Sequence, residues 1–118
     1  MRVSLQKLNP AVEKEILAIL FQVIVDTKDK LEIEQLLRSF LSKAELLCLA
    51  KRLAVAKNLN DGLSYAEIKG RLKISSATIS QIQEQLAEDP GLRIALRKIS
   101  VDEWASTWEK KIKNLFKK

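Results

Sequence analysis

The sequence predicts an all-α fold, and three observations support this. Only three of the 118 residues are Gly and two are Pro, so the residues that build turns between strands are scarce. Apolar residues recur at spacings of three and four, the period of a helix face, and alternating strand patterns are hard to find. Three Ser-x-x-Glu sequences, starting at Ser42, Ser64 and Ser100, match the capping box that opens many helices. A chain of this length is expected to bury one core.

The first helix is predicted from Asn9 to Thr27, with Asn9 as N-cap and Pro10 at the first helical position. Residues 1–8, which carry no firm signal, are interpreted as a flexible arm. The helix is apolar around more than half of its circumference, so it must be covered on several sides. In so small a chain a second subunit is the simplest cover, and the sequence predicts a homodimer with this helix in the interface. A central core helix in a monomer would show the same pattern.

Two helices are predicted next. Residues 28–40 form a short one, and the capping box of Ser42 and Glu45 opens a long one that runs to Asn60 and ends at Gly62 as its C′ residue. The apolar positions of the long helix keep helical period: Leu46, Leu49, Ala50, Leu53, Ala56 and Leu59. Its basic residues Lys43, Lys51, Arg52 and Lys57 could reach phosphates or pair with Glu residues. The single cysteine, Cys48, is expected to be a small buried hydrophobe.

Residues 64–86 are predicted to form two short helices joined by a tight turn. Ser64 and Ser75 are their N-caps, and the inner stripes are Ile68 with Leu72 and Ile79 with Ile82 and Leu86. The other face of the second helix is polar: Ser76, Ala77, Ser80, Gln81, Glu84 and Gln85, with Thr78 near its edge. An apolar inner stripe and small polar side chains at the N-terminal end suit the reading helix of a helix-turn-helix in a DNA major groove. An ordinary helical hairpin is the alternative.

The turn in this segment departs from the usual pattern. Such turns often place Gly where the chain passes through positive φ, and the residue at that point is Lys73. A left-handed conformation at Lys73 would cost about 1 kcal/mol.

Residues 89–118 are predicted to be a basic helical extension. Asp89 and Pro90 start a helix, and the box of Ser100 and Glu103 is expected to open a separate last helix. That helix is amphipathic, and its Trp104 and Trp108 are expected to pack on the body of the protein.

The positive charge is unevenly distributed along the chain. The net charge is +6; residues 1–41 are neutral, whereas residues 42–60 carry +3 and residues 104–118 carry +4. Basic segments on both sides of a helix-turn-helix suit a polyanionic partner such as double-stranded DNA. A solvated basic face is the alternative.

Other function classes find little support. The chain has no histidine and one cysteine, so common metal-ligand and nucleophile-base arrangements are missing, and no Gly-rich phosphate loop is present. We therefore expect neither an enzyme nor a cofactor. The longest apolar run, residues 16–25, is about half of a membrane span. A cytosolic (cytoplasmic) protein without membrane contact is predicted.

Residues 49–86 carry a resemblance to a known family; they read LAKRLAVAKNLNDGLSYAEIKGRLKISSATISQIQEQL. This segment resembles the core of the Trp repressor-like family, in particular its YerC/YecD-type branch, and so does AILFQVIVDTKDKLEIEQLLRSFLSKAEL upstream. The resemblance covers roughly residues 15–86. It implies an intertwined all-α homodimer, with a helical domain over residues 9–88 and its helix-turn-helix at 64–86. It also implies a bacterial transcription regulator of the repressor type.

The resemblance also implies roles for single residues. In Trp repressors the N-terminal end of the reading helix touches bases, and the positions that match are Ser76, Ala77 and Thr78. Lys69 matches a lysine near the DNA and Ser80 a neighbouring hydroxyl, while Lys73 and Gln81 are expected near the groove or backbone.

The tryptophan site of the family transfers poorly to this chain. Arg52 matches an arginine that holds the corepressor, but the second arginine falls on Gln81 and a neighbouring glycine on Ile82. A bulky Ile82 should obstruct an indole, so tryptophan binding is not expected. The leading hypothesis is thus a DNA-binding homodimer that works without tryptophan. A helical protein-interaction module that has lost DNA binding is the alternative.

Overall fold

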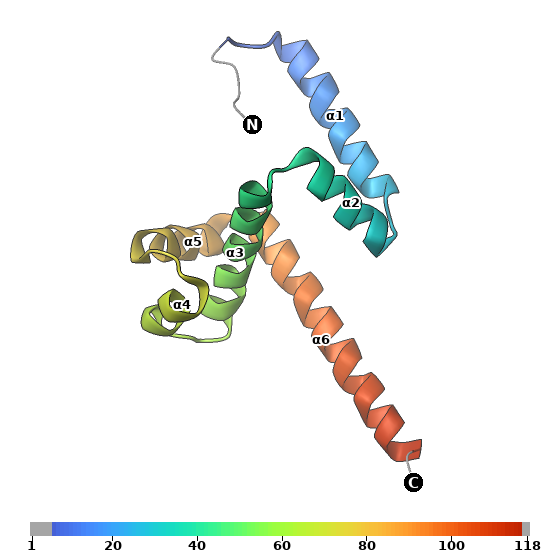
Figure 1. The fold of residues 1–118 in the computed structure, drawn as a ribbon, viewed down its shortest axis with the longest axis vertical. Coiled ribbons are helices and arrows are strands. Elements are labelled where there is room, and N and C mark those ends of the chain that lie inside the picture. The colour runs from blue at the N-terminus through green and yellow to red at the C-terminus, as the bar shows by residue number, and fades with distance from the viewer. Residues whose placement is uncertain (1–5, 117–118) are drawn as a thin grey trace. The chain divides into compact units, whose positions relative to one another are not determined.

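The computed structural model describes residues 6–116, apart from the side chains of residues 102, 104, 105, 107, 108 and 116. Within these residues it contains six α-helices and no strand (Figure 1), which confirms the predicted fold class. The helices are α1 (Pro10–Asp26), α2 (Lys30–Phe40), α3 (Lys43–Asn60), α4 (Tyr65–Leu72), α5 (Ser76–Glu88) and α6 (Pro90–Phe116). Residues 1–5 of the expected arm, and the side chains of Trp104 and Trp108, lie outside the described part.

The predicted caps of α1 and α3 are confirmed. The side chain of Asn9 accepts a hydrogen bond from the Ala11 N–H at 2.8 Å. Ser42 and Glu45 form both bonds of the capping box: the Glu45 N–H donates to Ser42 Oγ at 3.0 Å and the Ser42 N–H donates to Glu45 Oε1 at 2.7 Å. The bond from the Ser42 backbone lowers the pKa of the Glu45 carboxyl. Local side-chain chemistry thus determines where these helices begin.

The chain divides into two compact units, with the boundary between Cys48 and Leu49 inside α3. The first unit contains α1, α2 and the start of α3. Its α2 begins at Lys30, two residues later than predicted, because Asp29 is the N-cap and accepts from the Glu32 N–H at 3.1 Å. No side chain of residues 6–48 is buried. Cys48, which was expected to be buried, is exposed.

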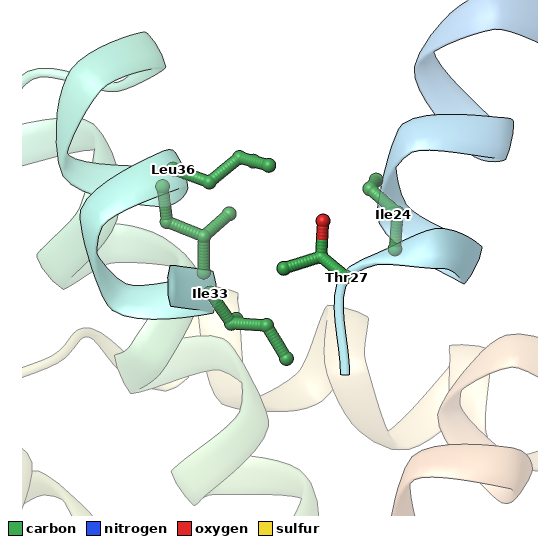
Figure 2. Close-up of a pocket in the computed structure, with 5 residues that line it drawn as sticks. Ile24, Thr27, Ile33 and Leu36 are labelled. Carbon is green, nitrogen blue, oxygen red and sulfur yellow. The ribbon is translucent and has the colours of Figure 1, made fainter. Parts of the chain in front are cut away.

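A small apolar pocket of about 130 Å³ lies between the end of α1 and α2 in this unit (Figure 2). It is lined by Ile24, Thr27, Ile33, Leu36 and Leu37. The hydroxyl of Thr27 donates to the Val23 carbonyl at 2.7 Å, so the polar atom of this lining residue is already engaged. The pocket therefore offers an apolar surface.

In the second unit α4 and α5 lie beside α3 (Figure 1), and these three helices share one hydrophobic core. Its buried members are Val55, Ala56, Ile68, Ile79 and Ile82. Leu72 and Leu86 of the predicted stripes pack against them, as does Ile74 in the turn, and Leu92 and Leu96 pack from α6. Burial of each Ile contributes about 1.5–3 kcal/mol. The core thus fixes α4 and α5 on α3.

The face that α3 buries differs in part from the predicted one. Val55 is fully buried although it lies outside the predicted stripe, whereas Leu49 and Leu53 of that stripe are 52% and 38% exposed. Because α3 is apolar on more than one side, helical period alone did not identify the side that meets α4 and α5.

Gly62 ends α3 as predicted. It has φ +85°, and the Gly62 N–H donates to the Leu59 carbonyl at 3.1 Å while the Leu63 N–H donates to the Asn58 carbonyl at 3.0 Å. These two bonds form a Schellman motif, which satisfies the last carbonyls of the helix.

The turn between α4 and α5 passes through positive φ at Lys73, where such turns often have Gly. Lys73 is left-handed, with φ 53° and ψ 53°, and its N–H donates to the Lys69 carbonyl at 3.0 Å. After this turn Ser75 caps α5, because its Oγ accepts from the Thr78 N–H at 3.2 Å. At Ser64 the corresponding bond from the Glu67 N–H is 3.2 Å. The two helices and this turn form a helix-turn-helix.

The prediction of a separate last helix is wrong. Residues Pro90–Phe116 form one continuous helix, α6, and Ser100 lies inside it. A capping box needs an Ncap residue outside helical φ and ψ, and no Gly or Pro after Gly91 breaks α6 there. A Ser inside a helix costs only a few tenths of a kcal/mol, less than the helical hydrogen bonds that a break would remove.

Replacing Lys73 by Gly tests the strain in this turn. Gly removes the left-handed penalty but adds entropy to the unfolded chain, so we expect the free energy of unfolding to rise by about 0.5–1 kcal/mol. Lys69→Gly is the matched control: it removes the same charge within α4 and should lower that free energy by about 1 kcal/mol. Urea unfolding of both variants measures the two effects. A loss of stability in Lys73→Gly would contradict the left-handed conformation.

Candidate nucleic-acid interface

The N-terminal end of α5 presents a small polar surface. Ser76, Ala77, Ser80 and Gln81 are exposed and Thr78 is half-buried, while Ile79 and Ile82 on the opposite face are in the core. The predicted base-reading residues are therefore together on the outer side of the first turns of this helix. Burial of the inner face holds them at a fixed angle to α4.

This end of α5 is also electrostatically suited to an anion. The first N–H groups of a helix lack carbonyl partners within it and carry the positive end of its dipole. The first turn of α5 contains no acidic residue that would neutralise this end. The Thr78 hydroxyl pairs with Ser75 Oγ at 2.9 Å, which still leaves a lone pair on Thr78 for another partner. A phosphate or a base edge could therefore be bound here.

Two lysines of the helix-turn-helix stand open to solvent. Lys69, in the last turn of α4, and Lys73, in the turn, are exposed, and neither side chain has a hydrogen bond or ion pair with any described residue. By contrast, Arg71 donates to Asn58 Oδ1 on α3 at 3.4 Å. Lys69 and Lys73 are thus free to meet a phosphate.

On α3, Lys57 is engaged inside the chain. Its Nζ lies 2.6 Å from Asp61 Oδ2 and 2.8 Å from Glu103 Oε1 on α6. The hydrogen bonds to Asp61 and then to Glu103 raise the pKa of Lys57. The basic residues of α3 were expected either to reach phosphates or to pair with Glu residues. Lys57 pairs with acidic residues within the chain.

Of the three positions that match the family's tryptophan site, two make contacts within the chain and one is exposed. Arg52 Nη2 donates to Gln85 Oε1 at 3.1 Å, and the side chain of Ile82 is 1% exposed within the core. Gln81 is exposed beside the polar end of α5. Position 82 therefore contributes to the packing that holds α5.

Three contacts to α5 were not foreseen from the sequence. The Tyr65 hydroxyl donates to Gln83, Arg52 donates to Gln85, and Arg93 donates to the backbone at the end of α5. Of these three contacts, only that of Arg93 could have been inferred from the sequence, because Arg93 follows closely after α5 and basic side chains favour the C-terminal end of a helix.

The described residues contain no group of three His, Cys, Asp or Glu side chains that could hold a metal ion. None of the helices of residues 6–116 is both long and apolar enough to cross a membrane.

Most of the helical region is similar to known proteins. A sequence model of the Trp repressor protein family matches residues 15–100. Among solved structures, a candidate Trp repressor from Staphylococcus aureus is similar, with a TM-score of 0.68 and 27% sequence identity over 78% of this chain and 96% of that one. The search of curated proteins found no match. The YerC/YecD-type branch stays a prediction. Because the family match spans most of the chain, the protein belongs to the Trp repressor family.

Proposed function

We propose that the protein is a sequence-specific, DNA-binding transcriptional regulator of the repressor type, which acts as a homodimer in the cytosol without tryptophan. The observation that carries this proposal is the exposed polar end of α5, whose opposite face is buried in the core of the helix-turn-helix. Membership in the Trp repressor family supports it. In this proposal residues 9–88 form the helical domain and residues 89–118 the basic extension.

The proposed division of labour follows the exposure of the side chains. Ser76, Ala77 and Thr78 would read base edges from the major groove, since they occupy the first turn of α5. Lys69, Lys73, Ser80 and Gln81 would contact the backbone or the groove edge around them. The open N–H groups of α5 add an anion site directed at the same place.

The proposed dimer rests on the first unit. None of its described side chains is buried, and the large apolar side chains of α1 are 39% to 60% exposed. Exposed apolar surface on this scale marks an interaction site in a soluble protein. A second copy that covers α1, with an apolar side chain in the pocket beside Ile24 and Leu36, would give this unit a core.

Independence from tryptophan rests on Arg52 and Ile82. Arg52 is bonded to Gln85, and Ile82 fills the core where a glycine would leave room for an indole. The exposed Gln81 cannot supply the second charged hydrogen bond, which is worth about 1.5–3 kcal/mol.

The dimer is tested by sedimentation. At micromolar concentration the protein should sediment as two chains, because α1 has too much exposed apolar surface for a small monomer. Phe21→Glu, which places a charge on α1, should shift the protein toward single chains. Leu115→Glu is the control, since it also places a charge at an exposed apolar position but outside the family match, and this variant should remain a dimer. Sedimentation of the unchanged protein as one chain would contradict the proposal.

The DNA site is tested by selection from random duplexes. We expect an inverted repeat with half-sites about one helical turn apart, because a two-fold dimer presents two reading helices. Thr78→Ala should cost about 1–3 kcal/mol and relax preference at one base position.

Lys69→Ala separates phosphate contacts from base contacts in the same assay. It should weaken binding to all duplexes alike and reduce the salt slope by about 0.9.

Recovery of a single asymmetric half-site in the selection would count against a dimer on DNA. Absence of any salt-dependent duplex binding would favour the protein-interaction module instead.

Calorimetric titration tests the absence of a tryptophan corepressor. L-tryptophan should give no saturable heat at micromolar concentration, and affinity for the selected duplex should be the same with and without it. Arg52→Ala is the control, because any signal that it leaves unchanged does not come from a pocket at Arg52. A several-fold gain in DNA affinity with tryptophan would show that Arg52 suffices and that Gln81 and Ile82 do not close the site.

A further inference from the structure

Arg93, in the first turn of α6, binds the backbone at the end of α5. Its Nε donates to the Leu86 carbonyl at 3.2 Å, and its Nη2 donates to the Ala87 carbonyl. The last carbonyls of a helix have no N–H partner within it and carry the negative end of its dipole. One rigid guanidinium therefore satisfies two such acceptors and links the direction of α5 to that of α6.

Two other helices hold the same half of α5. From α3, Arg52 donates to Gln85 Oε1 at 3.1 Å, and from α4 the Tyr65 hydroxyl donates to Gln83 Oε1. All of these contacts lie between residues 83 and 87. The opposite end, with the proposed base-reading residues, is left exposed.

We propose that Arg93 is a positioning residue for the reading helix: it sets the direction of α5 from the end that does not meet DNA. A change of 10° in the direction of a 13-residue helix moves its far end by about 3 Å, more than a base contact tolerates. The hydrogen bonds of Arg52 and Tyr65 hold α5 from α3 and α4. This inference rests on the proposed DNA-binding function and adds a residue outside the helix-turn-helix to it.

The test compares Arg93→Ala with Arg97→Ala. Arg97 is one turn further along α6, is exposed, and has no hydrogen bond or ion pair with the described residues, so both variants lose the same charge from the same helix. Arg93→Ala loses two exposed hydrogen bonds, each of small net effect, and should bind the selected duplex about three- to tenfold more weakly with an unchanged salt slope. Arg97→Ala should stay within about twofold of the unchanged protein. Arg93→Lys, which keeps one donor group, should recover part of the loss.

Amide hydrogen exchange of the free protein gives a second readout that needs no DNA. Arg93→Ala should speed exchange in the last turn of α5 by about three- to tenfold while the amide of Ile68 in the core keeps its protection. A salt slope reduced by about 0.9 with unchanged exchange would mean that Arg93 contacts phosphate, and the positioning role would be wrong. Equal behaviour of the Arg93 and Arg97 variants would also overturn it. If no duplex is bound by any variant, the proposed function fails, and exchange alone decides whether Arg93 holds α5.

Discussion

The packing of Ile68, Ile79 and Ile82 against Val55 and Ala56 is the contact on which the functional part of the chain depends. Three fully buried Ile side chains contribute several kcal/mol, which is larger than the strain of about 1 kcal/mol in the left-handed turn. The core therefore decides the angle between the two helices, and the turn adapts to it. Because this packing uses the inner face of α5, the polar outer face is free for a partner.

The first unit presents the opposite situation. Its helices are well formed and capped, yet none of its described side chains is buried. Helix caps and propensities contribute about 1 kcal/mol each, which cannot replace a core, since most helical stability in proteins comes from packing. Stable α1 and α2 thus require cover that this unit does not supply itself. In the proposed dimer the second copy supplies it, so folding of the first unit and assembly would be one process.

Contacts between residues close in the sequence were predictable from it, whereas contacts between helices were not. The caps at Asn9, Ser42 and Ser75 were predicted correctly because they involve residues two or three apart. The helix start predicted at the Ser100 capping box was wrong, because a capping pattern permits a helix to begin but does not force it to begin inside a run of good helix formers. The contacts of Arg93 join side chains to backbone across two helices, and nothing in the pattern of a single helix specifies them.

In the proposed function, the packing around α5 bears on how DNA binding could be controlled. A small molecule shifts an equilibrium only if it binds two conformations with different affinity. Ile82 is in the core and Arg93 donates to the backbone at the far end of α5, so in the proposed function these contacts, and not a bound small molecule, hold the helix. In the proposed dimer, each subunit raises the effective concentration of the other reading helix at its half-site. Occupancy of DNA would then follow the concentration of dimer, and cover of α1 by the second copy would be the step that determines it.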